Sequence, residues 1–238
     1  MNNILIIVPA YNEEKNIENV IKSLIKNKLS VDIIVINDGS IDNTSEKAKK
    51  TGDATVIDLP GNVGIGGAVQ TGFKFAYRNN YDIAIQFDGD GQHNSSQINK
   101  IIQPIIENTA DCVIGSRFIG DKRGFQSTKS RRIGIKILEF INSILIKQRI
   151  TDNTSGFRAY NRNIIELFAK DYPSDFPEPE AVIILGKQGY RILEVPVMMN
   201  ERTAGNSSIS GFKSAYYMIK VILSIFMTYL GIQGDKKC

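Results

Sequence analysis

Two aspartates stand one glycine apart in the segment "FDGDGQH", residues 87–93. The segment follows "YDIAIQ", an apolar run that predicts a buried β-strand. Two carboxylates that close repel each other, and a divalent cation between them relieves the repulsion. Mg²⁺ and Mn²⁺ prefer oxygen ligands, commonly one or two carboxylates together with substrate phosphates. Asp88 and Asp90 are therefore candidate metal ligands, and Gln92 can supply a third oxygen.

A plainer interpretation exists for the same residues. Aspartates of this spacing also occur in surface turns, where each side chain bonds to its own backbone. His93 is the only histidine of the chain, and taken alone it is more simply a structural residue than a catalytic one. The predicted secondary structure around these residues is therefore needed to distinguish a surface turn from a metal site.

Apolar runs of strand length alternate with helical patterns along the chain. Because the strands are apolar on both faces, the pattern predicts an α/β fold with a mostly parallel sheet. Ligands on such sheets bind beyond the carboxyl ends of the strands, so the polar strand ends should line one crevice. The predicted strands cover residues 3–9, 31–37, 54–59, 81–87, 110–116 and 191–197, and the predicted helices cover 17–25, 42–50, a stretch ending near 77, a stretch between 87 and 110, 133–147, a stretch after "FPEPE", and 212–232.

Bulk composition limits the class of protein. The chain has 238 residues, of which 42% are hydrophobic, and this favours a single globular domain. A net charge of +4 is too weak to indicate a nucleic-acid partner and is compatible with an anionic substrate or a membrane surface. Two cysteines form neither a disulfide framework nor a zinc pattern, and the N-terminus lacks a signal peptide. A cytoplasmic location is the expectation.

Seven motifs occur in order: "VPAYNEE", "NDGSIDNT", "GNVGIGGAVQTG", "FDGDGQH", "GSRF", "SGFRAY" and "EVPV". Together they resemble glycosyltransferase family 2, whose fold is the GT-A nucleotide-sugar-binding sheet, from residue 4 to about residue 210. Within the family the chain is most similar to the dolichol-phosphate mannose synthase and polyprenyl-phosphate glycosyltransferase branch. The resemblance implies a GT-A domain over 1–210, with a nucleotide-sugar-binding half (1–118), an acceptor half (119–210) and a C-terminal segment (211–238).

The resemblance also implies a donor site at the first strand ends. Tyr11 offers a stacking face for a base, and carboxylates accept hydrogen bonds from ribose hydroxyls or a base N–H. Glu13 could instead only complement a helix dipole. The glycines of residues 61–72 follow the third strand, not the first, so they predict close helix packing beneath the nucleotide and not a dinucleotide fingerprint. The residues implied for the donor nucleotide are Pro9, Ala10, Tyr11, Glu13, Ile36, Asp38 and Asp88.

For the acceptor, the resemblance implies three arginines that bind a lipid phosphate: Arg117, Arg131 and Arg202. Arginine suits this task because its fork pairs two phosphate oxygens and stays charged. Arg131 and Arg132 could instead belong to a solvated basic loop. Ser208 stands where the family often has a lysine.

The implied reaction is an inverting displacement that depends on Mg²⁺ or Mn²⁺ held by Asp88, Asp90 and Gln92. Asp90 and Asp152 are the implied catalytic residues, and Asp152 would position a substrate, or act as a base if the acceptor were a hydroxyl. Glu178 and Glu180 are further acids, although a helix N-terminus favours such residues anyway. A transferase acting on a sugar hydroxyl and a non-catalytic nucleotide-sugar-binding module remain alternatives.

The C-terminal segment is predicted to be a helix of about 30 Å with a narrow polar stripe, and Lys220 lies in its middle. This pattern favours a helix in the membrane interface, with peripheral attachment at the cytoplasmic face or docking onto a small membrane protein. The alternative is a helix packed on the domain's own core or in a homo-oligomer.

Overall fold

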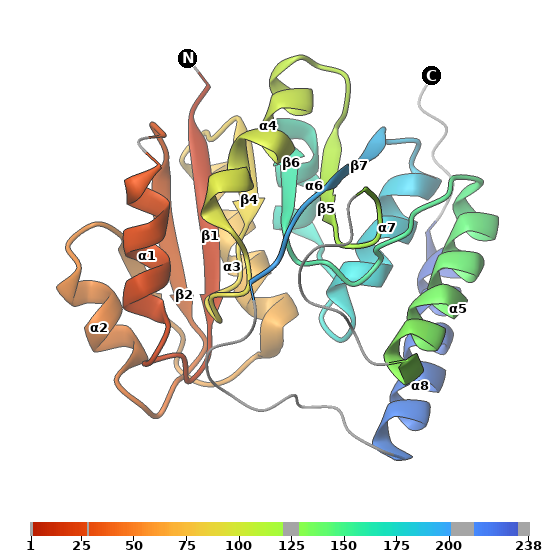
Figure 1. Ribbon diagram of the computed structural model, residues 1–238, viewed down its shortest axis with the longest axis horizontal. Helices are drawn as coiled ribbons and strands as arrows, with labels where there is room; N and C mark the ends of the chain where they lie inside the picture. Colours follow the sequence, from red (N-terminus) through yellow and green to blue (C-terminus); the bar gives the residue numbers. More distant parts are fainter. Residues whose placement is uncertain (1, 28, 121–128, 201–211, 233–238) are drawn as a thin grey trace.

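A seven-stranded sheet forms the centre of the computed structural model, which describes residues 2–27, 29–120, 129–200 and 212–232. The strand order is β3-β2-β1-β4-β6-β5-β7 (Figure 1). β6 runs antiparallel to β4 and β5, and the other neighbouring pairs are parallel. The strands are β1 (Ile4–Ala10), β2 (Asp32–Asn37), β3 (Thr55–Asp58), β4 (Ile83–Gln86), β5 (Cys112–Ser116), β6 (Arg158–Asn161) and β7 (Ile192–Pro196).

The prediction of an α/β fold with a mostly parallel sheet is confirmed, and so are the six predicted strands. Residues 151–162 are turn-rich in sequence and were not among the predicted strands, but β6 lies within this segment. β6 has four residues and begins with an arginine. It therefore lacks the apolar, β-branched pattern of the other strands, and pairing with β4 and β5 on both sides holds it in the sheet.

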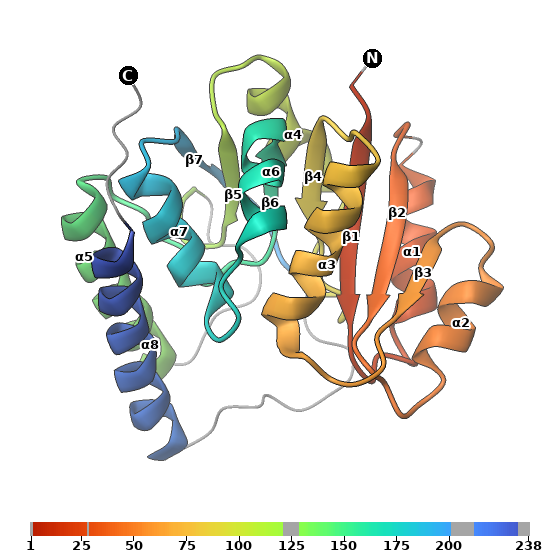
Figure 2. The same cartoon turned by 180° about the vertical axis from the view of Figure 1, so that it is seen from behind.

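Helices cover both faces of the sheet (Figures 1 and 2). One core lies between the sheet and α1, α2 and α4, and a second core lies between the sheet and α3, α6 and α7. A short 3₁₀ helix, η1 (Ser95–Gln97), precedes α4. The helices are α1 (Ile17–Lys26), α2 (Thr44–Lys50), α3 (Gly64–Arg78), α4 (Ile98–Ile106), α5 (Lys129–Ile146), α6 (Arg162–Lys170), α7 (Pro177–Lys187) and α8 (Phe212–Gly231).

Two glycines let α3 pack closely, Gly72 against the sheet and Gly66 against the loop between α6 and α7. A Cβ atom at Gly72 would lie 2.3 Å from a methyl carbon of Ile7 in β1. A Cβ atom at Gly66 would lie 2.3 Å from the carbonyl oxygen of Pro173. The close packing predicted for this glycine-rich segment is thereby confirmed.

α5 and α8 form an outer layer over α7, on the side away from the sheet (Figures 1 and 2). Val221 and Ile225 of α8 are buried in a small cluster with Ile183 of α7 and Leu138 of α5. The opposite side of α8 is exposed. The C-terminal helix therefore has one packed face and one open face, and within the described ranges no helix has the length and hydropathy needed to cross a bilayer.

Strand register brings the predicted polar ends together. Ala10 of β1 pairs with Asn37 of β2, and Asn37 pairs with Asp58 of β3, so these three strands end level with one another. β4 stops at Gln86, opposite Ile7, and the chain then continues past the end of β1. The segment that carries Asp88 and Asp90 consequently lies beside the last residues of β1.

Candidate active site

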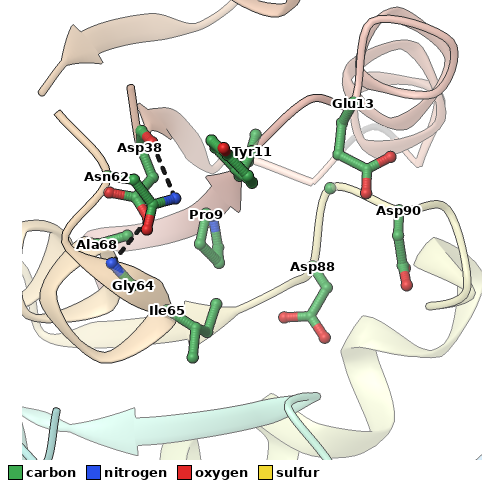
Figure 3. Close-up of a pocket in the computed structure, with 12 residues that line it drawn as sticks. Pro9, Tyr11, Glu13, Asp38, Asn62, Gly64, Ile65, Ala68, Asp88 and Asp90 are labelled. Atoms are coloured by element: carbon green, nitrogen blue, oxygen red, sulfur yellow. Dashed lines mark hydrogen bonds between the residues drawn. The ribbon is translucent and has the colours of Figure 1, made fainter. Parts of the chain in front are cut away.

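A cavity of about 350 Å³ lies at the carboxyl ends of β1, β2 and β4. Tyr11 stands in its middle, with Asp38 and Asn62 on one side and Asp88 and Asp90 on the other (Figure 3). Six of the seven residues predicted to bind the donor nucleotide line this cavity: Pro9, Ala10, Tyr11, Glu13, Asp38 and Asp88. The seventh, Ile36, is fully buried in the core beneath α3, because alternate side chains of a strand point to opposite faces.

Asp38 ties the loop after β2 to the start of α3. Its two carboxylate oxygens accept hydrogen bonds from the backbone N–H groups of Val63, at 2.7 Å, and Gly64, at 3.0 Å. The loops approach so closely that a Cβ at Gly39, where φ is +66°, would lie 2.6 Å from the carbonyl carbon of Gly61. Asp38 is therefore held in one orientation by the backbone that surrounds it.

The glycine-rich segment also forms part of the cavity wall, which was not predicted. The segment was expected to pack beneath the nucleotide, but four of its residues line the cavity: Asn62, Gly64, Ile65 and Ala68. The signal was present in the sequence, since the segment follows the third strand at the same edge of the sheet. Asn62 adds an amide that can both donate and accept hydrogen bonds.

Asp88 and Asp90 both line the cavity, on either side of Gly89. Burial raises the pKa of Asp88 to about 7, and the negative charge of Asp90 adds to the rise. Asp88 Oδ1 is buried and has no hydrogen-bond partner in the part of the chain that the structure describes. A Cβ at Gly156 would lie 2.8 Å from Asp88 Oδ2, so only glycine leaves room for the carboxylate there.

These features fit a hard divalent cation, because an unpaired carboxylate oxygen beside a second carboxylate is the donor set that Mg²⁺ and Mn²⁺ take. Among the described residues no group of three or more His, Cys, Asp and Glu side chains surrounds a single point. An ion held here would therefore need oxygen ligands from its substrate or from water. Gln92, the predicted third ligand, donates its backbone N–H to Asp90 Oδ1 at 3.0 Å, and its side chain is outside the cavity lining.

His93 holds the backbone of the acidic segment at Asp88. Its Nδ1 accepts the backbone N–H of Asp88 at 3.0 Å, and its ring stacks on Phe157 with centroids 5.1 Å apart. Burial lowers the pKa of His93 to about 4, so the ring is neutral. Because Nδ1 accepts a hydrogen bond, the proton is assigned to Nε2, which lies 3.4 Å from Asp88 Oδ2. His93 therefore has a structural role, as the sequence suggested, and this role is to hold Asp88 in place.

Arg117 and Asp152 form an ion pair at the end of β5. Asp152 is fully buried, and its oxygens accept the backbone N–H of Arg117 at 3.0 Å, Nε at 2.8 Å and one terminal nitrogen at 2.7 Å. The same terminal nitrogen donates to Thr154 Oγ1 at 2.7 Å. Burial lowers the pKa of Arg117, but the bonds to Asp152 outweigh it and leave this pKa raised.

The pair lies near the acidic segment, since the charge of Arg117 lowers the pKa of Asp88 against the effect of burial. Arg117 and Asp152 were predicted separately, and the structure brings them together. Asp152 is not among the residues that line the cavity. Of the other two predicted arginines, Arg202 and the side chain of Arg131 lie outside the described residues.

The two further acids, at the start of α7, differ from each other. Glu180 accepts the backbone N–H of Phe176 at 3.2 Å and the hydroxyl of Thr228 at 2.6 Å, so it caps α7 and fastens α8. Glu178 lies 3.5 Å from Gln86 Nε2, and burial raises its pKa against the opposing charge of Arg158. Glu178, unlike Glu180, therefore belongs to the polar group beside Asp88.

Arg158 was not predicted as a site residue, although it lies in the motif "SGFRAY". It is fully buried and donates to the backbone carbonyls of Ser155 at 2.7 Å, Glu178 at 2.9 Å and Asn153 at 3.1 Å. These bonds join the segment after Asp152 to the start of α7. The function of Arg158 in the site is to hold these two segments in place.

Comparisons with known proteins agree with this geometry. A model of the family described as "Glycosyl transferase family 2" matches residues 5–168. The chain is 34% identical to a UDP-N-acetylglucosamine–dolichyl-phosphate N-acetylglucosaminyltransferase of Methanococcus voltae, over 91% of this chain and 94% of that protein. It is 28% identical to an undecaprenyl-phosphate mannosyltransferase of Micrococcus luteus, over 87% of this chain and 88% of that protein.

The fold is shared with a solved structure, glucosyl-3-phosphoglycerate synthase from Mycobacterium tuberculosis in complex with Mn²⁺, uridine diphosphate and phosphoglyceric acid. The TM-score is 0.72 at 19% identity, over 98% of this chain and 80% of that one. The family match covers more than half of the chain. This chain therefore belongs to glycosyltransferase family 2 and is a glycosyltransferase with the GT-A type of fold.

Proposed function

We propose that this family 2 glycosyltransferase moves a sugar from a nucleotide-sugar to the phosphate of a polyprenyl phosphate, with inversion at the anomeric carbon. The observation that carries the proposal is the Arg117–Asp152 pair beside Asp88. It sets a fixed positive charge next to the predicted place of the donor diphosphate. The names of the two relatives, which include dolichyl phosphate and undecaprenyl phosphate, support the same class of acceptor.

The donor nucleotide occupies the cavity in this proposal, with its base near Asp38 and Asn62 and its diphosphate near Asp88 and Asp90 (Figure 3). Tyr11 is 47% exposed and offers the ring face on which a base can stack. Asp38 can accept further hydrogen bonds, since each carboxylate oxygen has two acceptor sites. Both ends of the cavity thus match the chemistry of a nucleoside diphosphate.

Asp88 and Asp90 would hold Mg²⁺ or Mn²⁺, with Gln92 as the predicted third ligand. The bound ion would supply Lewis-acid neutralisation of the charge that develops on the leaving diphosphate. The chain's own part is to place the two carboxylates: His93 fixes the backbone at Asp88, and Gly156 leaves space for the Asp88 side chain.

Arg117 binds the acceptor phosphate in this proposal, and Asp152 orients its guanidinium group. A phosphate monoester needs no general base, because its second pKa is about 6 and it is mostly dianionic at neutral pH. A hydroxyl acceptor would need a base, and Asp152 was the predicted one. Both Asp152 oxygens accept hydrogen bonds from Arg117, so the carboxylate is engaged as a counter-ion. This arrangement favours the phosphate acceptor over the hydroxyl alternative.

The proposal includes peripheral attachment at the cytoplasmic face of a membrane. α8 exposes a row of apolar side chains, and α5 exposes a second row. Lys220 Nζ lies over the Tyr216 ring at 4.8 Å, which suits a basic side chain at headgroup level. The exposed apolar residues are Tyr216, Ile219, Leu223, Phe226, Met227 and Leu230 on α8, and Ile133, Ile137, Phe140 and Ile144 on α5.

The acceptor class is tested by supplying purified protein with polyprenyl phosphate, or with a lipid-linked sugar that offers only hydroxyl groups. A thermal-shift screen first identifies the nucleotide-sugar that binds. Transfer to the phosphate and not to the hydroxyl is expected. Transfer to the hydroxyl alone overturns the proposal. The division into a donor half (1–118) and an acceptor half (119–210) stays a prediction.

Membrane attachment is tested by flotation with anionic liposomes. Deleting α8 would uncover its buried contacts with α7, so a charge on the open face is the cleaner change. Leu223→Asp together with Leu230→Asp should abolish flotation while the melting temperature stays close to wild type. Lys100→Asp on the distant α4 serves as a control for charge alone. Flotation by the double variant equal to wild type contradicts the attachment.

A further inference from the structure

Glu194 lies in the middle of β7, in the motif "EVPV", and has no place in the function described so far. Its carboxylate accepts three hydrogen bonds from the segment that carries Asp152. The donors are the Thr151 backbone N–H at 2.8 Å, the Thr151 hydroxyl at 2.9 Å and the Asp152 backbone N–H at 2.8 Å. Hydrogen bonds to an ionised acceptor are the stronger kind, so this carboxylate fixes the backbone where Asp152 begins.

The fixed segment in turn holds Arg117. Asp152 accepts from Nε and a terminal nitrogen of Arg117 at 2.8 and 2.7 Å. Thr151 Oγ1 also lies 3.0 Å from Ser116 Oγ, directly before Arg117 in the chain. Two contacts therefore orient Arg117, one from Asp152 and one from Thr151 through Ser116. Glu194 is hydrogen-bonded to both Asp152 and Thr151.

Sheet register explains why Glu194 can reach this segment. β7 pairs in parallel with β5, and Glu194 lies opposite Ile114. Arg117 lies three residues further along the chain, just beyond the end of β5 at Ser116. Glu194 therefore lies on the strand beside β5, a little before the carboxyl end of that strand. From there its carboxylate reaches the segment of Thr151 and Asp152.

We propose that Glu194 is a positioning residue for the acceptor phosphate: it holds Thr151 and Asp152 so that Asp152 aims the Arg117 guanidinium at the phosphate. This rests on the proposed function, in which Arg117 binds that phosphate. Glu194 itself does not touch the substrate. Its removal loosens the orientation of Arg117 and leaves the donor cavity unchanged, because Glu194 is not among the residues that line it.

The test measures binding of farnesyl phosphate, with farnesol as the matched ligand that lacks the phosphate. Glu194→Gln keeps the size of the side chain but replaces one accepting oxygen by an N–H₂ group that opposes the Thr151 or Asp152 N–H. Farnesyl phosphate affinity should fall about fivefold to tenfold, whereas farnesol and nucleoside diphosphate affinities should stay within about twofold. Glu166→Gln, which breaks an exposed ion pair with Lys170, is the matched control and should change none of these affinities.

A double-variant cycle shows whether Glu194 acts through Arg117. In the Arg117→Ala background, Glu194→Gln should cause no further loss of farnesyl phosphate affinity. Losses that multiply in the double variant overturn the proposal, and so does a folded Glu194→Gln protein with wild-type affinity. If Glu194→Gln fails to fold, Thr151→Val, which removes only the hydroxyl contact, serves in its place with a smaller expected loss. Arg117→Ala alone with unchanged affinity overturns the proposed role of Arg117 instead, so the two failures are distinguishable.

Discussion

Asp88 and Asp152 are carboxylates at the same edge of one sheet, and their surroundings are opposite. Asp152 is fully buried and accepts three hydrogen bonds from Arg117. The negative charge of Asp90 helps to raise the pKa of Asp88, and one oxygen of Asp88 is buried without a partner among the described residues. A carboxylate that carries its own cation stabilises the fold and orients that cation. A carboxylate opposed by a second one is arranged for a cation that comes from solution.

The largest effect is expected from removing one member of the acidic pair. Asp90→Ala should lower turnover by at least about 10³-fold, because the remaining carboxylate holds a divalent ion poorly. Turnover with Mn²⁺ and calorimetric Mn²⁺ binding in the presence of nucleoside diphosphate are the measurements, and excess EDTA should have the same effect as the substitution. Asp53→Ala, at an exposed loop position, is the control. Full activity of either Asp90→Ala or the EDTA-treated protein contradicts the metal assignment.

Breaking the Arg117–Asp152 pair should affect the fold. Asp152→Asn leaves a guanidinium group that is only 15% exposed without its counter-ion. The free energy of unfolding should fall by about 3 kcal/mol. In a protein of this size the melting temperature should drop by roughly 6–12 °C.

The control for that loss is a second substitution. Arg117→Met in the Asp152→Asn background removes the unpaired charge and should recover part of the stability. Calorimetric melting of the three proteins provides the comparison. A melting temperature of Asp152→Asn equal to that of wild type would show that the pair does not support the fold.

Arg117→Ala separates the two sides of the site. Farnesyl phosphate affinity should fall about 10-fold to 100-fold, the loss of a hydrogen bond to a charged group, and nucleoside diphosphate affinity should change little. Arg191→Ala is the matched control, because Arg191 forms a similar pair with Asp111, at 2.9 Å, away from the cavity. If donor affinity falls as much as acceptor affinity, Arg117 belongs to the donor site.

The sequence predicted the fold wherever apolar pattern dictates structure. β1 and β2 are apolar on both faces, and their ends were placed within two residues. β6 was not predicted because three of its four residues carry polar side chains and the strand depends on neighbours distant in the chain. Local pattern cannot reveal a strand whose stability comes from pairing on both sides.

The site divides in the same way. Asp88 and Asp90 are two residues apart, so sequence alone exposes their repulsion. Arg117 and Asp152 are 35 residues apart, and their pairing follows only from the strand order. For the same reason, the sequence did not predict that Asp38 accepts hydrogen bonds from backbone N–H groups. One of these groups belongs to Val63, 25 residues further along the chain.

The smallest expected effect reverses the sign of the Asp152 result. Asp88→Asn keeps the side-chain shape and removes a charge that is disfavoured in the metal-free protein. The pKa of Asp88 is about 7 in the folded protein and near 3.8 when the chain is unfolded. The folded protein therefore binds a proton that the unfolded chain releases, and wild-type stability falls as the pH rises from about 4 to about 7.

Asp88→Asn escapes this fall, so its advantage over wild type should be absent at pH 4 and complete at pH 8. Because the Asp88 side chain is 34% exposed, solvent screening reduces the gain to about 1–2 kcal/mol, or roughly 2–8 °C in melting temperature. Asp58→Asn is the control of opposite sign. Hydrogen bonds from Lys49 and Asn37 lower the pKa of Asp58 to about 2, so its carboxylate stabilises the fold above pH 4 and the substitution destabilises there. Melting curves at pH 4, 6 and 8 without metal decide the matter. Asp88→Asn melting below wild type at pH 8 would mean that Asp88, like Asp152, already has its cation within the fold.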